Sequence, residues 1–242
     1  MRRRFFVSRF DGITAVMDGE AAHHLGRVLR AQEGQLYELS DGQKVWLARI
    51  DKADRNRVEF ALVEELPAYK PALHFSLLLA VVKFDAFEWA IEKATELGVS
   101  AIVPLAAARS EKGLLAAAEK RSERWRKILL EASQQSRSVD VPTLAPVAKI
   151  ETAFRAITTG VRLILSELPT AEPLRAVLTQ YTDGASVAAI AIGPEGGWTD
   201  AEFASARTCQ FQEASLGKLI LRTETAVTAA LASMNYALSI ES

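Results

Sequence analysis

Residues 67 to 71 divide the chain into two parts with different sequence patterns, and this division limits the folds open to it. Pro67-Ala-Tyr-Lys-Pro71 holds two prolines in five residues, which suits neither a strand nor a helix and predicts a linker. Strand-like runs before the linker predict a small β-barrel. Apolar runs that alternate with helical patterns after it predict a parallel sheet covered on both faces. We therefore expect an α/β protein with two domains, residues 1–70 and 71–242.

The expected elements follow from these two patterns. In the first domain we predict strands at Phe5–Val7, Gln35–Leu39, Lys44–Ile50 and Arg57–Val63, and a short helix near Asp18–Arg30. In the second domain we predict strands at Leu73–Val82, Ala101–Leu105, Leu163–Ser166 and Val187–Ile192. Its helices are expected at Asp85–Leu97, Glu119–Ser133, Thr199–Arg207 and Thr223–Ser239. Asp41-Gly42 predicts a hairpin turn between two barrel strands.

The first helix of the second domain carries capping signals at both ends. Asp85 with Glu88 predicts a capping box, and Phe84 can pack on Trp89 as a hydrophobic staple. Gly98 is expected to end this helix, because glycine readily adopts the left-handed conformation of a helix C-terminus.

A second capped helix start follows a glycine-rich turn. Thr199 with Glu202 predicts another capping box, and Trp198 with Phe203 its staple. The preceding segment Gly193-Pro-Glu-Gly-Gly197 therefore lies between a buried strand and a capped helix. In a parallel sheet this is the carboxyl end of a strand, where ligands collect.

The glycines of this turn have two interpretations. They can bring backbone groups close to a cofactor, or they can serve only a tight turn that needs positive φ. The pattern matches neither the dinucleotide-binding motif nor the P-loop, so it indicates neither a dinucleotide nor a nucleoside triphosphate.

A second glycine-containing segment, Leu216–Ala226, strengthens the cofactor interpretation. Gly217 opens a short apolar run, Leu219–Leu221, which is predicted to be a buried strand ending in Arg222. Thr223 would be the N-cap of the last helix, so the positive charge of Arg222 would lie beside the helix N-terminus, which also carries partial positive charge. An arginine at an element boundary is equally compatible with a plain surface residue. The last helix has a predicted buried stripe of Ala226, Val227, Ala230, Leu231, Met234 and Leu238.

The net charge of −1 excludes a uniformly basic chain, so contact with nucleic acid requires local patches. Basic residues gather at the N-terminus and recur along the short helix; these are Arg2, Arg3, Arg4 and Arg9, then His23, Arg27 and Arg30. Together they predict a phosphate-binding face on the barrel, although each cluster alone also suits a solvated surface. The basic residues Arg121, Arg124, Arg126, Lys127 and Arg137 are interpreted as a solvated face.

Metal and nucleophile chemistry find little support in the sequence. The three histidines show no ligand spacing, so no metal is expected. Cys209, the only cysteine, has no histidine near it and predicts an inert buried thiol in a reducing compartment. The basic N-terminus lacks an apolar run, and no stretch is long enough for a membrane span. We expect a cytoplasmic protein without a secretory signal.

Four motifs together resemble a known family. They are His24-Leu-x-x-Val-Leu-Arg30, Lys83-x-Asp-x-x-Glu-x-x-Ile-x-Lys-Ala-Thr-Glu-Leu-Gly98, Gly193-Pro-Glu-Gly-Gly197 and Leu216-Gly-x-x-Ile-Leu-Arg-Thr-Glu-Thr-Ala226. In this order and over nearly the whole chain they resemble the bacterial RsmE family, ribosomal RNA small-subunit uridine N3-methyltransferases of the SPOUT superfamily. Leu219 departs from the family pattern, which has arginine there in many members.

The resemblance implies a PUA-like barrel that helps to bind RNA, a catalytic domain with a trefoil knot, and a homodimer. It implies S-adenosylmethionine as cofactor, held in a bent form among three loops. The cofactor-binding residues it implies are Leu165, Ser166, Gly193, Pro194, Gly196, Gly197, Leu216, Ile220, Leu221 and Thr223.

The activity implied is direct transfer of a methyl group to N3 of a uridine in 16S rRNA. Arg222 is the candidate for stabilising negative charge on the uracil oxygens, and Glu195 or Glu224 the candidate proton acceptor. The partner is 16S rRNA, expected within the assembled small subunit. Its candidate contacts are Arg4, Arg9, His24, Arg27 and Arg30.

Two other functions stay open on the sequence alone. A related SPOUT methyltransferase could modify another RNA position, such as a ribose 2′-hydroxyl. A non-catalytic RNA-binding or ribosome assembly factor could keep the same fold without binding the cofactor. A dinucleotide enzyme is disfavoured because the G-x-G-x-x-G motif is absent.

Overall fold

The computed structural model describes residues 3–71, 73–181 and 185–238. The chain forms two compact units. The first comprises Met1–Lys70 with Ser133–Val141, and the second comprises Pro71–Ala132 with Pro142–Ser242. Over the described part of the chain, no helix combines the length and the apolar composition that crossing a membrane requires.

The first unit is a six-stranded sheet that surrounds a single core. Its strands are β1 (Arg4–Phe6), β2 (Phe10–Asp11), β3 (Thr14–Asp18), β4 (Leu36–Ser40), β5 (Val45–Ala53) and β6 (Arg57–Leu66). They pair in the order β1-β4-β5-β6-β3-β2, antiparallel except for β1 with β4. The four predicted strands are confirmed, and the hairpin turn at Asp41-Gly42 joins β4 to β5 with Gly42 at φ +86°. The strands β2 and β3 were missed.

The predicted helix near Asp18–Arg30 is shorter and less regular than the sequence suggests. It consists of α1 (Gly19–His23) and a π-helical turn, His24–Val28, and Arg30 lies beyond it with φ +51°. Arg30 therefore lies outside the helical segment that carries His23 and Arg27, and the predicted row of three basic residues on one helix does not form.

The second unit is built on an eight-stranded parallel sheet. Its strands are β7 (His74–Ala80), β8 (Ala101–Ala106), β9 (Thr143–Leu144), β10 (Ala148–Lys149), β11 (Val161–Leu165), β12 (Glu172–Pro173), β13 (Val187–Ile192) and β14 (Gln212–Ser215). The main order is β10-β8-β7-β13-β11-β14-β12, and β9 pairs with β8. The inner strand β7 is buried from Leu77 to Ala80, because helices cover both faces of the sheet.

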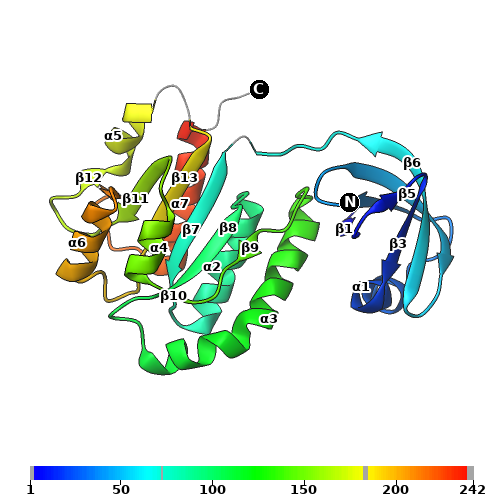
Figure 1. Cartoon of the computed structure of the whole chain (residues 1–242), viewed down its shortest axis with the longest axis horizontal. Coiled ribbons are helices and arrows are strands. Elements are labelled where there is room, and N and C mark those ends of the chain that lie inside the picture. Colours follow the sequence, from blue (N-terminus) through cyan, green and yellow to red (C-terminus); the bar gives the residue numbers. More distant parts are fainter. Residues whose placement is uncertain (1–2, 72, 182–184, 239–242) are drawn as a thin grey trace. The chain divides into compact units, whose positions relative to one another are not determined.

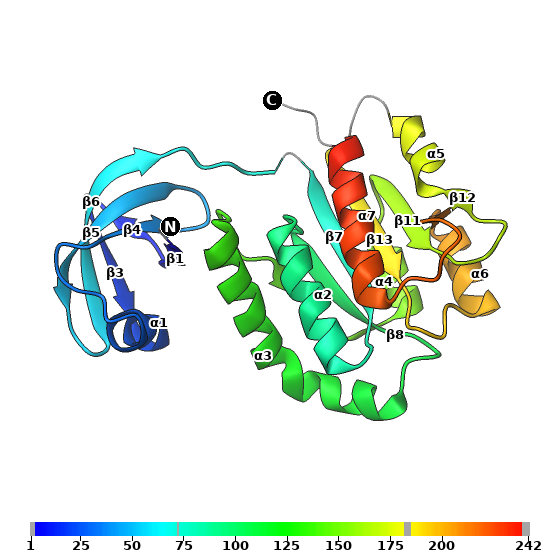
Figure 2. The same ribbon diagram turned by 180° about the vertical axis from the view of Figure 1, so that it is seen from behind.

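The helices of this unit are α2 (Phe84–Glu96), α3 (Lys112–Ser136, whose last turn groups with the first unit), α4 (Ile150–Ala156), α5 (Leu174–Leu178), α6 (Asp200–Thr208) and α7 (Thr223–Leu238). Figure 1 shows α4 in front of the sheet, and Figure 2 shows α2 and α7 on the opposite face. The four strands and four helices predicted for the main pattern of this unit are present, β13 with its predicted ends and the others with shifted ends. The short elements β9, β10, β12, β14, α4 and α5 were not predicted.

The predicted capping box at Asp85 is wrong. Lys83 is the N-cap of α2 and makes no side-chain cap. Glu88 is 8% exposed and accepts hydrogen bonds from Arg121 and Arg124 on α3, and these charged partners take the carboxylate away from the helix start. Gly98 does end the helix, with φ +81°.

The predicted staple between Phe84 and Trp89 is also absent from the ring contacts of α2. Phe84 packs edge-on against Trp125, with ring centroids 6.1 Å apart. Trp89 is 44% exposed and lies under the Lys93 ammonium. The buried Trp125 of α3 offers Phe84 a larger apolar partner than a neighbour in its own helix.

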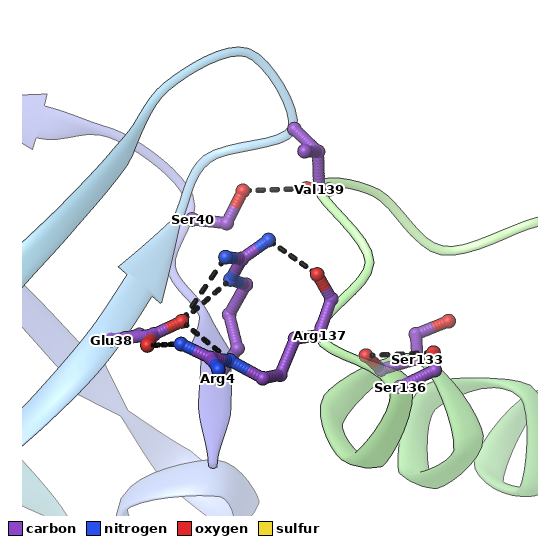
Figure 3. Close-up of polar contacts among 7 residues, drawn as sticks. All are labelled: Arg4, Glu38, Ser40, Ser133, Ser136, Arg137 and Val139. Atoms are coloured by element: carbon purple, nitrogen blue, oxygen red, sulfur yellow. Dashed lines mark hydrogen bonds and ion pairs between the residues drawn. The ribbon is translucent and has the colours of Figure 1, made fainter. Parts of the chain in front are cut away.

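A buried carboxylate joins two distant stretches of sequence within the first unit (Figure 3). Glu38 on β4 is 3% exposed and pairs with Arg4 on β1 and with Arg137. Arg4 also donates to the backbone oxygen of Arg137, and the Ser40 hydroxyl donates to that of Val139. These bonds hold residues 137–139 on the sheet, so Arg137, whose side chain is 44% exposed, has a structural role that the predicted solvated face did not include.

Removing the charge of Glu38 should destabilise the first unit. Glu38→Gln leaves the buried Arg4 guanidinium without its counter-charge, and we expect a loss of roughly 3 kcal/mol in the free energy of unfolding. Urea unfolding of the full chain, followed by circular dichroism, measures it. The control Glu65→Gln removes an exposed partner of Lys44 and should cost less than about 0.5 kcal/mol. Equal unfolding midpoints for the two variants would contradict the prediction.

Candidate functional site

A cavity lies in the second unit where three parallel strands end. Its walls come from the segments that follow β11, β13 and β14, with Arg109 from the segment after β8. All of the predicted cofactor-binding residues except Gly196 line it: Leu165, Ser166, Gly193, Pro194, Gly197, Leu216, Ile220, Leu221 and Thr223. The structure thus brings together three segments that are far apart in the sequence.

The Gly193–Gly197 segment forms a tight turn that is also a wall of this cavity. The Gly197 amide donates to the Pro194 oxygen at 2.8 Å, and Gly197 has φ +69°. A Cβ on Gly193 would lie 3.0 Å from the Trp198 indole. The turn therefore needs Gly197 for its conformation and Gly193 for close packing against Trp198, which supports the tight-turn interpretation. The cofactor interpretation stays a prediction.

Trp198 links the turn to the loop after β11. Its buried indole N–H donates to the Leu165 oxygen at 2.9 Å. Its ring also packs edge-on against Phe154, with centroids 6.4 Å apart. Because an unpaired buried indole N–H or carbonyl is costly, this bond fixes the spacing between two walls of the cavity.

The capping box of α6 is confirmed. The Thr199 hydroxyl accepts from the Glu202 amide, and the Glu202 carboxylate accepts from the Thr199 amide at 2.8 Å. Trp198 and Phe203, the predicted staple, belong to one buried cluster and both line the cavity. These contacts fix α6 directly after the glycine turn.

The segment between β14 and α7 differs from its prediction. Residues 219–221 form no strand, and Leu219 and Ile220 are 83% and 80% exposed. The predicted buried strand is therefore wrong, since no neighbouring strand pairs with this apolar run. Thr223 begins α7 and donates its hydroxyl to the Gly193 oxygen at 3.2 Å, so it bridges two walls of the cavity instead of capping the helix. The buried stripe of α7 is confirmed, except that Ala226 is only half-buried.

The three candidate catalytic residues lie differently with respect to the cavity. Glu195 lines it and is exposed. Arg222 is exposed and stands between two lining residues without lining the cavity itself, and Glu224 is half-buried in the first turn of α7. Gly196 is also outside the lining, although both its neighbours belong to it.

The candidate RNA-binding residues all lie in the first unit. Arg9, Arg27 and Arg30 are exposed, and His24 is half-buried. Arg27 and His23 line a second cavity together with the turn between β5 and β6. Arg4 does not fit its predicted role, because its side chain is buried and its charge is engaged by Glu38.

Two charged residues of this cavity were missed by the sequence analysis. Arg109 follows β8, and Glu167 follows β11. The rule that ligands collect at the carboxyl ends of parallel strands could have drawn attention to both. Among the described residues there is no group of three or more metal-ligating side chains, and Cys209 is a free, half-buried thiol.

Comparisons with known proteins find matches to both parts of the chain. A family model described as an RNA methyltransferase domain matches residues 69–235, and one described as an RNA methyltransferase PUA domain matches residues 17–63. The ribosomal RNA small subunit methyltransferase E of Synechocystis sp. is 33% identical over 228 residues, which cover 92% of this chain and 73% of that protein. The protein of the same name from Bacillus subtilis is 30% identical over 236 residues, which cover 92% and 90%.

Two solved structures resemble the whole chain. The ribosomal RNA small subunit methyltransferase E of Neisseria gonorrhoeae bound to S-adenosyl methionine has a TM-score of 0.86 at 30% identity, with 98% of each chain covered. A putative methyltransferase of Legionella pneumophila in complex with the same cofactor has a TM-score of 0.85 at 28% identity, again with 98% of each chain covered.

The parallel α/β unit and the PUA unit define an RNA methyltransferase. Family model and relatives together place it more narrowly: the chain belongs to the ribosomal RNA small subunit methyltransferase E family. The family resemblance seen in the sequence and the predicted fold class are confirmed. The trefoil knot stays a prediction.

Proposed function

We propose that this protein binds S-adenosylmethionine in the cavity at the ends of β11, β13 and β14 and methylates N3 of a specific uridine in 16S rRNA. The observation that carries the proposal is the convergence of three separate loops on one cavity, in a chain of this family. The relatives named above support the substrate and the cofactor.

The residues of the cavity fit the chemistry of this cofactor. Leu165, Ile192 and Leu221 offer apolar surface for a planar adenine ring, and the glycine turn offers exposed backbone groups for its polar edge. The carboxylates of Glu167 and Glu195 suit the ribose hydroxyls and the cationic groups of the ligand. When bound, S-adenosylmethionine supplies an electrophilic methyl group that needs no covalent enzyme intermediate.

The residues of the chain then have to orient the uracil and remove the proton from its imide nitrogen, N3. Arg222, beside the cavity, would stabilise negative charge on the uracil oxygens as N3 loses that proton. Glu195 or Glu224 would accept the proton; Glu195 is favoured because it lines the cavity. N3 is paired in a duplex, so the target base has to be unpaired or extruded.

Binding of RNA is assigned to the first unit. Arg9, Arg27 and Arg30 have exposed side chains, and His24 lies in the same helical segment as Arg27. Such side chains position an RNA by its phosphates without reading its sequence. The assembled small subunit is the proposed form of the substrate.

A homodimer is also proposed, and the surface of the second unit supports it. Tyr236 on α7 is 93% exposed, and it lines a cavity together with the exposed Ala232 and Ala237 of the same helix. Exposed apolar patches of this kind mark protein interfaces, and sedimentation velocity would show a monomer if the idea is wrong.

A cytoplasmic location completes the proposal, in keeping with the free thiol of Cys209.

A non-catalytic assembly factor is the alternative function. The deciding experiment incubates the chain with tritiated S-adenosylmethionine and small subunits from cells that lack this gene. We expect the label in 3-methyluridine after digestion of the RNA. Label in another nucleoside would reassign the target, and absence of both label and cofactor binding would favour the assembly factor.

The role of Arg222 can be separated from cofactor binding. Arg222→Ala should lower kcat by about 100-fold or more, because charge on the uracil oxygens loses its stabilising cation, and leave the Kd for S-adenosylmethionine near that of the wild type. Single-turnover methylation and calorimetry measure the two. Arg207→Ala, at an exposed arginine of α6, is the control. Full activity would remove Arg222 from the mechanism.

The RNA-binding surface predicts a specific salt dependence. Replacement of Arg9, Arg27 or Arg30 by glutamine should weaken RNA binding and reduce the slope of log K against log salt by about one unit for each RNA phosphate that is no longer neutralised. Arg49→Gln is the matched control, because Arg49 is an exposed arginine of the same unit already paired with Asp51. Slopes indistinguishable from the wild type would reject this surface.

A further inference from the structure

Arg109 lies on the wall of the cofactor cavity and touches the glycine turn at several points. Its Nη1 donates to the backbone oxygen of Gly196 at 2.6 Å and to that of Trp198 at 3.2 Å. Bonds from a guanidinium to carbonyl oxygens are charge-assisted and stronger than neutral ones. One side chain from the segment after β8 thus binds two backbone carbonyls, those of Gly196 and Trp198, in the segment after β13.

The aliphatic part of Arg109 explains why residue 196 is glycine. A Cβ on Gly196 would lie 3.3 Å from both Cβ and Cδ of Arg109, closer than side chains normally pack. Gly196 does not itself line the cavity and its φ is not positive. Its lack of a side chain therefore serves the approach of Arg109.

The peptide between Gly196 and Gly197 is held at both of its polar atoms. Arg109 binds the carbonyl oxygen on one side, and the amide N–H donates to Pro194 on the other at 2.8 Å. A peptide group is planar, so these two bonds fix its orientation. The shape of the turn, and of the cavity wall it forms, depends on this peptide.

The segment that carries Arg109 is itself fixed to the helix that follows the turn. The Ala108 amide donates to Glu202 Oε1 at 2.8 Å, and the other oxygen of this buried carboxylate caps α6 at Thr199. The backbone next to Arg109 is therefore fixed by α6, and the Arg109 side chain contacts the turn that precedes α6.

We propose that Arg109 is a positioning residue for cofactor binding, which makes the segment after β8 a fourth wall of the site. The inference rests on the proposed function and extends it beyond the three loops. Arg109 acts by keeping the turn Pro194–Gly197 in its binding shape before the ligand arrives, so that binding does not bear the cost of ordering the turn. Its loss should therefore weaken cofactor affinity more than it slows methyl transfer.

Calorimetry of S-adenosylmethionine binding to the full chain tests this role. Arg109→Met keeps the unbranched stem over Gly196 and removes the donors, and we expect a Kd about tenfold higher. At saturating cofactor, kcat should stay near that of the wild type. Arg109→Lys should recover part of the affinity, because an ammonium can still donate to one carbonyl. Arg155→Met, at an exposed arginine of α4, is the matched control.

Gly196→Ala provides a second route to the same result. Its Cβ would displace the stem of Arg109, so the Kd should also rise although residue 196 is outside the cavity. A wild-type Kd in Arg109→Met would overturn the inference. If kcat were lost while the Kd stayed unchanged, Arg109 would act on the RNA substrate instead. Failure of the wild-type chain to bind would overturn the proposed function, and this inference with it.

Discussion

Parallel pairing of β11, β13 and β14 is the constraint on which the site depends. Parallel strands all end at the same edge of a sheet, so the segments after Leu165, Ile192 and Ser215 meet there although some 50 residues separate the first from the last. Hydrogen bonds then set the distances between these segments: the indole of Trp198 reaches Leu165, and the hydroxyl of Thr223 reaches Gly193. The strand topology thus brings the three segments together, and the side-chain hydrogen bonds then set the width of the cavity between them.

Local signals in the sequence predicted local structure well. β13 was predicted to the residue, and the capping box of Thr199 and Glu202 was correct because both partners lie within one turn. The same motif failed at Asp85, where Arg121 and Arg124, more than thirty residues away in the sequence, claim Glu88. A capping box is a weak interaction, and two charged partners outweigh it.

Most residues of the candidate site could be chosen from the sequence because their motifs resemble a family. Physical patterning alone misjudged residues 219–221, since an apolar run predicts burial and these residues stand exposed. It also missed Arg109, whose partners are the carbonyls of Gly196 and Trp198 and leave no pattern near Arg109 in the sequence. Arg4 shows the converse: a basic cluster predicted a free charge, and the fold places Glu38 beside it.

The grouping of Ser133–Val141 with the first unit has a consequence for synthesis. The backbone passes from one unit to the other three times, after Lys70, after Ala132 and after Val141. A ribosome that has made the first seventy residues has not yet made Arg137 or Val139. The sheet around Glu38 and Ser40 therefore lacks these hydrogen-bond partners until residues 133–141 are translated. The N-terminal unit therefore cannot reach its final form as an independent early folding step, and a fragment cut at the proline linker would lack part of its own structure.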